Sequence, residues 1–120
     1  MSKADSSRVQ EYLRHILQAI QRIDRYVEDV AEPDFLSDEK TQDAVIRNFE
    51  IIGEACNNIT KYHADYADSH PEVPWGFAYE MRNALAHGYF KVDLEIVWKT
   101  IHSDLPGMAT ELQRLLNTPK

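Results

Sequence analysis

The stretch VQEYLRHILQAIQRIDRYVEDV, residues 9–30, decides the fold class of this chain. Its apolar residues recur at alternating steps of four and three, which is the spacing of one face of an α-helix. These residues are Val9, Leu13, Ile16, Ile20, Ile23, Val27 and Val30. Ser6 or Ser7 can cap the start of this helix, and Pro33 lies just beyond its end. We therefore expect one long helix followed by a loop over residues 31–36.

A second helical stripe follows Ser37, which we expect to be its N-cap, with two acids in the first turn. The same spacing returns in Val45, Phe49, Ile52, Cys56 and Ile59. Further apolar residues widen this stripe, which predicts contact with more than one neighbouring helix. Gly53 lies inside the helix at a cost of about 1 kcal/mol relative to alanine. We expect it to permit a close helix approach, such as a dimer seam.

The rest of the chain predicts further helices. Between residues 60 and 74 the pattern weakens, which favours a short helical turn and a loop. Pro74 suits the first position of a third long helix, and Gly88 suits its C-terminal stop. A fourth begins near Leu94 and should kink or divide at Pro106. Because no alternating apolar–polar run of useful length appears, the sequence predicts an all-α, up-and-down bundle of four to five helices.

Length and composition limit the class of protein. The 120 residues, 43% of them hydrophobic, suffice for one core, so we predict a single domain over residues 1–120, with flexible ends at 1–7 and 117–120. No apolar run approaches the roughly 20 residues of a membrane span, and no signal core appears, so we expect a cytoplasmic protein without membrane association. The lone Cys56 excludes an internal disulfide and falls on an apolar stripe, where we expect a buried thiol without chemistry.

The formal charge of -7 argues against a broad nucleic-acid surface, because affinity for a polyphosphate comes from clustered lysine and arginine. The 13 basic residues still suffice for one electropositive cleft. Four of the histidines lack any metal-ligand spacing, so the sequence predicts no metal site. They are His15, His63, His70 and His102.

The stretch MRNALAHGY, residues 81–89, holds the side chains that could carry chemistry. Asn83 and His87 are four residues apart and share a helical face, so the amide can hydrogen-bond the imidazole and fix its tautomer. Arg82 is long enough to reach the same place. Metal-free RNA cleavage needs a base, an acid and a cation for the developing phosphorane charge, which histidine and arginine supply. From spacing alone, a helix-end histidine and an arginine in a surface ion pair explain these residues at least as well.

Two further charged residues lie on the second predicted helix. Arg47 and Glu54 are seven residues apart, on nearly the same face. They could line the same cleft or hold Arg82 in position. A solvated ion-pair face is an equally good interpretation.

The sequence also resembles a known family. Arg82-Asn83 followed by His87-Gly88-Tyr89 is similar to the Arg-x-x-x-x-His-x-Tyr motif of the HepT toxins within the HEPN superfamily. Further segments resemble that family in the same order, at residues 41–48, 52–55, 74–75 and 92–98. The resemblance covers the chain from about Tyr12 to Leu115.

This resemblance implies a HEPN-like helical homodimer with Arg82 and His87 of both copies at the dimer cleft. It implies a metal-independent endoribonuclease toxin of a type VII-like toxin–antitoxin pair, with RNA as substrate and no cofactor of its own. In that family an MntA-like nucleotidyltransferase antitoxin is understood to transfer AMP from ATP to the motif tyrosine, here Tyr89. The alternative is a non-catalytic HEPN module that docks a nucleotidyltransferase, which the acidic charge would suit.

Overall fold

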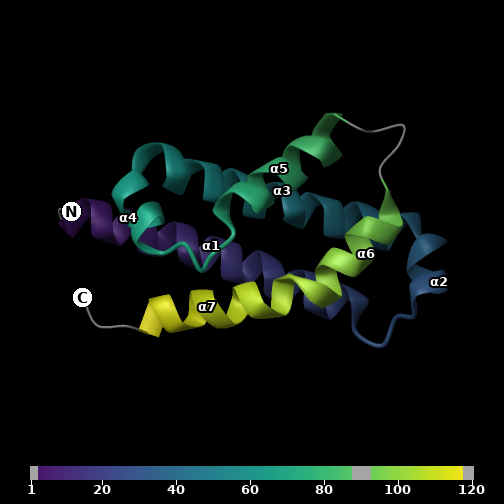
Figure 1. Ribbon diagram of the computed structural model, residues 1–120. Helices are drawn as coiled ribbons and strands as arrows, with labels where there is room; N and C mark the ends of the chain where they lie inside the picture. Colours follow the sequence, from purple (N-terminus) through teal and green to yellow (C-terminus); the bar gives the residue numbers. More distant parts are fainter. Residues whose placement is uncertain (1–2, 88–92, 118–120) are drawn as a thin grey trace.

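The computed structural model describes the backbone of residues 3–87 and 93–117, and the side chains of residues 6–83 and 93–117. Within these ranges the chain is all-α, as the sequence predicts, with seven helices and no strand (Figure 1). The five long helices are α1 (Lys3–Val27), α3 (Glu39–Tyr62), α5 (Trp75–His87), α6 (Leu94–Ser103) and α7 (Leu105–Asn117). Two short helices, α2 (Glu32–Leu36) and α4 (Ala64–Ser69), connect them.

The core is built from the two predicted stripes. On α1 every member of the stripe from Val9 to Val27 is buried, and on α3 the stripe from Val45 to Ile59 is buried as well. Helix α3 packs against α1 on one side and against α5 on another, while α7 packs against α1 (Figure 1). The prediction that the wide stripe of the second long helix contacts more than one neighbour is therefore confirmed.

The connection between α1 and α3 differs from the sequence-based prediction. Residues 31–36, expected as a loop, contain α2, with Pro33 in its first turn, where no backbone N–H is needed. The predicted cap Ser37 instead closes α2, because its hydroxyl donates to the carbonyl of Pro33 at 3.1 Å. Asp38 is the N-cap of α3, and its carboxylate accepts from the backbone N–H of Thr41 at 3.3 Å.

The start of the first helix also differs. Helix α1 begins at Lys3, ahead of the predicted caps Ser6 and Ser7, so residues 3–7 continue the helix where a flexible end was expected. None of these residues is a helix breaker, so the helix propagates to the start of the described chain.

The C-terminal half divides as predicted. Helix α6 ends at Ser103 and α7 begins at Leu105, so Pro106 falls in the first turn of α7, where its missing N–H breaks no hydrogen bond. Pro74 directly precedes α5, one residue before the position predicted for it. None of the helices in the described ranges combines the length and the apolar content that crossing a bilayer requires.

Candidate active site

Helix α5 carries the motif residues, and Arg82 lies where this helix meets α3. Arg82 is half-buried, and Gly53 of α3 lies directly opposite its Cβ. A Cβ added at Gly53 would overlap the Cβ of Arg82 and would lie 2.9 Å from the carbonyl oxygen of Ala78. The prediction that Gly53 permits a close helix approach is confirmed, and the partner helix belongs to the same chain.

The Arg82 guanidinium turns toward its neighbour along the chain. Its Nη1 donates to Oδ1 of Asn83 at 2.9 Å. Among the described residues it forms no salt bridge with a carboxylate. An arginine has five N–H donors, and one of those of Arg82 takes part in a hydrogen bond among the described residues.

The hydrogen bond described for Asn83 is the one with Arg82. Asn83 accepts from Arg82 through Oδ1, and the predicted hydrogen bond between Asn83 and His87 stays a prediction. His87 is the last residue of α5, but its side chain lies outside the described residues, as does Tyr89 altogether. The convergence of Arg82 and His87 stays a prediction.

The two charged residues predicted to support the site lie on α3. Arg47 pairs with Glu50 one turn away, with Nη1 and Oε2 3.6 Å apart, and its side chain is 68% exposed. Glu54 is exposed and forms no hydrogen bond or salt bridge with the side chains described. This geometry fits a solvated ion-pair face for Arg47 and brings neither residue into a hydrogen bond with Arg82.

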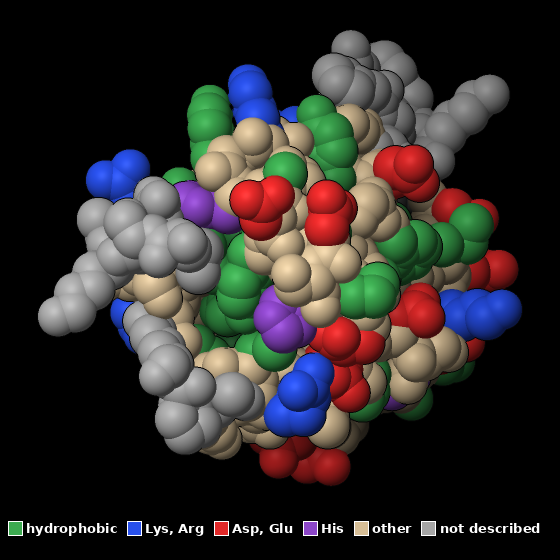
Figure 2. Space-filling view, turned by 60° about the vertical axis from the view of Figure 1, so that its left-hand side comes forward, with side chains coloured by type: hydrophobic (Ala, Val, Ile, Leu, Met, Phe, Trp, Pro, Cys, Tyr) green, Lys and Arg blue, Asp and Glu red, His purple; other side chains and the backbone are tan. Residues whose placement is uncertain are grey.

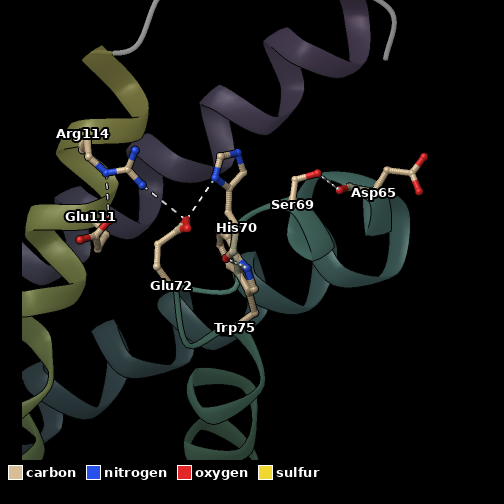
Figure 3. Close-up of polar contacts among 7 residues, drawn as sticks. All are labelled: Asp65, Ser69, His70, Glu72, Trp75, Glu111 and Arg114. Carbon is tan, nitrogen blue, oxygen red and sulfur yellow. Dashed lines mark hydrogen bonds and ion pairs between the residues drawn. The ribbon is translucent and has the colours of Figure 1, made fainter.

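The start of α5 is fixed by a buried tryptophan. Trp75 is buried, and its indole Nε1 donates to the carbonyl oxygen of His70 at 3.0 Å (Figure 3). The edge of its ring also faces Tyr66, with ring centroids 6.4 Å apart. Trp75 therefore ties the first turn of α5 to the end of α4.

A polar cluster ties the same region to α7. The carboxylate of Glu72 lies 3.1 Å from Nδ1 of His70 and 3.5 Å from Nη2 of Arg114, which also binds Glu111 at 3.0 Å through Nε (Figure 3). The loop before α5 is thus held from two sides. The position of the motif helix is fixed at its N-terminal end, while its C-terminal end, which bears His87, extends away from α6 (Figure 1).

The structure favours neither a cysteine nucleophile nor a metal site among the described residues. Burial raises the pKa of the Cys56 thiol to about 12, so this cysteine stays protonated and is no nucleophile at neutral pH. In the part of the chain that the structure describes, no three histidine, cysteine or acidic side chains gather in a way that could hold a metal ion.

The face at the α4 end of the molecule has no basic patch. Figure 2 shows lysine and arginine side chains standing apart there, with acidic side chains among them. Because a polyphosphate needs several clustered cations, the described residues of this face do not favour nucleic-acid binding. Helix α5 therefore remains the candidate.

The fold and the motif together define a class of protein. The chain is an all-α bundle in which Arg82 and Asn83 stand five and four residues before His87 on one helix, an arrangement that agrees with the resemblance to HEPN proteins. The family model described as "Ribonuclease HepT-like" matches residues 16–115, most of the chain. This chain belongs to the HepT-like ribonuclease family.

Individual relatives agree with this assignment. The chain is 43% identical over 105 residues to "Probable ribonuclease HepT" of Thermococcus cleftensis, covering 88% of this chain and 93% of that protein. It is 35% identical over 109 residues to a "Putative RNase" of Caldanaerobacter subterraneus subsp. tengcongensis, covering 91% of this chain and 95% of the relative. No solved structure matches the chain.

One functional contact could not be predicted from the sequence. A glycine in the apolar stripe of a helix predicts that another helix packs closely there, but the sequence does not identify which residue of that helix makes the contact. Only the packing of α3 against α5 identifies Arg82 as the neighbour of Gly53.

Proposed function

We propose that this chain is a metal-independent endoribonuclease in which Arg82 binds the scissile phosphate and His87 transfers protons. The observation that carries the proposal is that Arg82, a half-buried residue, donates from its guanidinium to an amide and forms no salt bridge with any carboxylate described. A structural arginine in this position would normally be neutralised by an acid, because a partly buried charge without a partner is costly. A guanidinium left without an acid suits a phosphate instead.

The proposed reaction needs no group outside the chain and its substrate. A base removes the proton of the ribose 2′-hydroxyl, and the oxygen attacks the adjacent phosphorus. The bond from phosphorus to the 5′-oxygen breaks, an acid gives that oxygen a proton, and the products are a cyclic phosphate and a 5′-hydroxyl. Arg82 stabilises the charge on the phosphorane oxygens, and His87 serves as base or acid because an unperturbed imidazole titrates near pH 6.5.

We further propose that two copies of the chain form the complete site. One imidazole does not easily serve as acid and base in the same step, whereas a two-fold dimer supplies two. Support comes from Phe77, a large apolar side chain that is 44% exposed on the same helix as Arg82. We propose that this side chain packs against the second copy of the chain.

The ribonuclease proposal is tested with purified protein and a labelled single-stranded RNA in EDTA. We expect cleavage that leaves cyclic phosphate ends, and we expect Arg82→Ala and His87→Ala each to lose about 100-fold or more of the rate. Equal rates for His87→Ala and wild type would exclude the mechanism. In cells, growth arrest that persists in Arg82→Ala would favour a non-catalytic adaptor instead.

The partner that we propose is a nucleotidyltransferase antitoxin acting on Tyr89, two residues after His87. The phenol oxygen would attack the α-phosphorus of ATP, pyrophosphate would leave, and the phenol proton would pass to solvent. The added anion would then repel the RNA phosphate from Arg82. Intact-mass measurement after co-expression with an MntA-like nucleotidyltransferase should show added AMP in wild type and none in Tyr89→Phe, and an unmodified wild type would refute this step.

A further inference from the structure

We infer that Gly53 is a positioning residue for Arg82: the missing side chain at position 53 sets where the guanidinium lies. This inference rests on the proposed role of Arg82 in cleavage. It concerns a residue of α3 that makes no contact through a side chain of its own and lies outside the motif.

The geometry at this point leaves no room for any larger residue. A Cβ at position 53 would meet three atoms of α5 at or below 2.9 Å, namely Cβ and Cγ of Arg82 and the carbonyl oxygen of Ala78. Real Cβ atoms essentially never approach other atoms below 3.0 Å. Two of these atoms belong to the backbone or are attached directly to it, so rotating the arginine side chain cannot relieve the overlap. A methyl group would have to push α5 away from α3.

The other helical glycines with described surroundings do not have this property. A Cβ added at Gly76 of α5 or at Gly107 of α7 would meet nothing within 4 Å. Of these three glycines, Gly53 alone cannot be replaced by a larger residue without a clash, and it is the glycine that faces Arg82. A glycine inside a helix weakens that helix, so its presence calls for a local reason, and the packing of Arg82 supplies one.

The Arg82 side chain is therefore held at both ends. Its Cβ and Cγ rest on the backbone of α3 at Gly53, and its Nη1 binds Oδ1 of Asn83 at 2.9 Å. Fewer rotamers remain open to an arginine held in this way, so less freedom is lost when a phosphate binds. Moving α5 outward would move Arg82 and the backbone of the last turn together, and a misplacement of about 1 Å can cost on the order of 100-fold in rate.

The test compares Gly53→Ala with the matched variants Gly76→Ala and Gly107→Ala, using the full chain and the same RNA. We expect Gly53→Ala to lower kcat by about 10- to 100-fold and to raise KM as well, because a displaced Arg82 contacts the phosphate less well in both the bound substrate and the transition state. We expect both matched variants to stay within about twofold of wild type. Rates are normalised to the folded fraction from circular dichroism.

A double-mutant cycle separates positioning from simple destabilisation. If Gly53 acts through Arg82, Gly53→Ala should cost much less in an Arg82→Lys background than in wild type, because the residues share one function. Additive losses would overturn the inference. Full activity of Gly53→Ala beside an inactive Arg82→Ala would also overturn it while leaving the ribonuclease proposal intact, whereas an active Arg82→Ala would remove the proposal itself.

A measurement on wild-type protein keeps the inference testable even where Gly53→Ala does not fold. Nuclear Overhauser effects should connect the α protons of Gly53 with the β protons of Arg82, since the two residues touch. Their absence in an assigned spectrum would show that Arg82 does not rest on Gly53 and would overturn the inference.

Discussion

The guanidinium of Arg82 donates from Nη1 to Oδ1 of Asn83 at 2.9 Å, so two consecutive side chains of α5 act as one unit. Consecutive residues on a helix point about 100° apart, and only a long side chain can bend back across that angle. The bond turns the charged group of Arg82 toward the side of α5 on which positions 83 and 87 lie.

Replacing Asn83 tests this orienting bond. Asn83→Ala should lower kcat for RNA cleavage by about tenfold, because the guanidinium loses one anchor but keeps its charge. Asn83→Asp should cost more, since a carboxylate next to Arg82 would pair with it and repel the phosphate. Steady-state rates at several salt concentrations would measure both effects. A rate for Asn83→Asp above that of Asn83→Ala would contradict this role.

Arg82→Lys keeps the charge and changes its shape. We expect cleavage to fall by about 10- to 100-fold, because an ammonium cannot bind two phosphate oxygens as a planar guanidinium does. The matched control is Arg14→Lys, at an exposed position of α1, which should cleave at the wild-type rate. A fully active Arg82→Lys would mean that only the charge matters at this position.

Phe77→Asp should dissociate the proposed dimer. A carboxylate placed in an apolar interface loses its hydration without gaining a partner, so the monomer is favoured. Sedimentation equilibrium of wild type and variant would measure this. Tyr62→Asp is the control, because Tyr62 is 63% exposed at the end of α3, away from α5. A wild-type protein that sediments as a monomer would refute the dimer.

Cys56 should be unreactive in the folded protein. Its pKa is raised to about 12 by burial, so at about pH 8 the thiol is protonated and shielded from reagents. Mass spectrometry after iodoacetamide treatment should show an unmodified native chain and complete alkylation once guanidinium chloride unfolds it. Rapid alkylation of native protein would mean that the helix pair opens.

Acid should remove the stabilising effect of the Asp38 charge. The hydroxyl of Thr41, which donates at 2.6 Å, and its backbone N–H lower the pKa of Asp38 below its ordinary value of 3.8. The folded pKa is the lower one, so the stabilisation is present above the unfolded pKa and is lost as pH falls through the folded pKa. Asp38→Asn keeps a capping oxygen but cannot titrate.

Thermal unfolding of both proteins across this pH range checks the sign. The wild type should exceed Asp38→Asn in Tm at neutral pH, and the difference should vanish in strong acid. A difference that grows as the pH falls would contradict the assigned direction of the pKa shift.

The helices and most of the core could be predicted from the amino-acid sequence. Periodicity is a local property, because residues three and four apart share a helical face wherever the helix packs, so the stripes from Val9 and from Val45 were readable without any coordinates. The residues that cap the helices were harder to predict. Ser37 and Asp38 are both good N-caps, and only the formation of α2 decides that the serine closes one helix while the aspartate opens the next.

Tertiary structure alone decided what surrounds Arg82. Gly53 and Arg82 are far apart in sequence, and their contact depends on the angle and depth at which α3 and α5 pack. The hydrogen bond from Arg82 to Asn83 depends on that same packing, because an arginine side chain that lies against α3 has few conformations left. A local sequence pattern predicts which residues share one face of a helix. Which residues of two packed helices contact each other depends on all the contacts in the core.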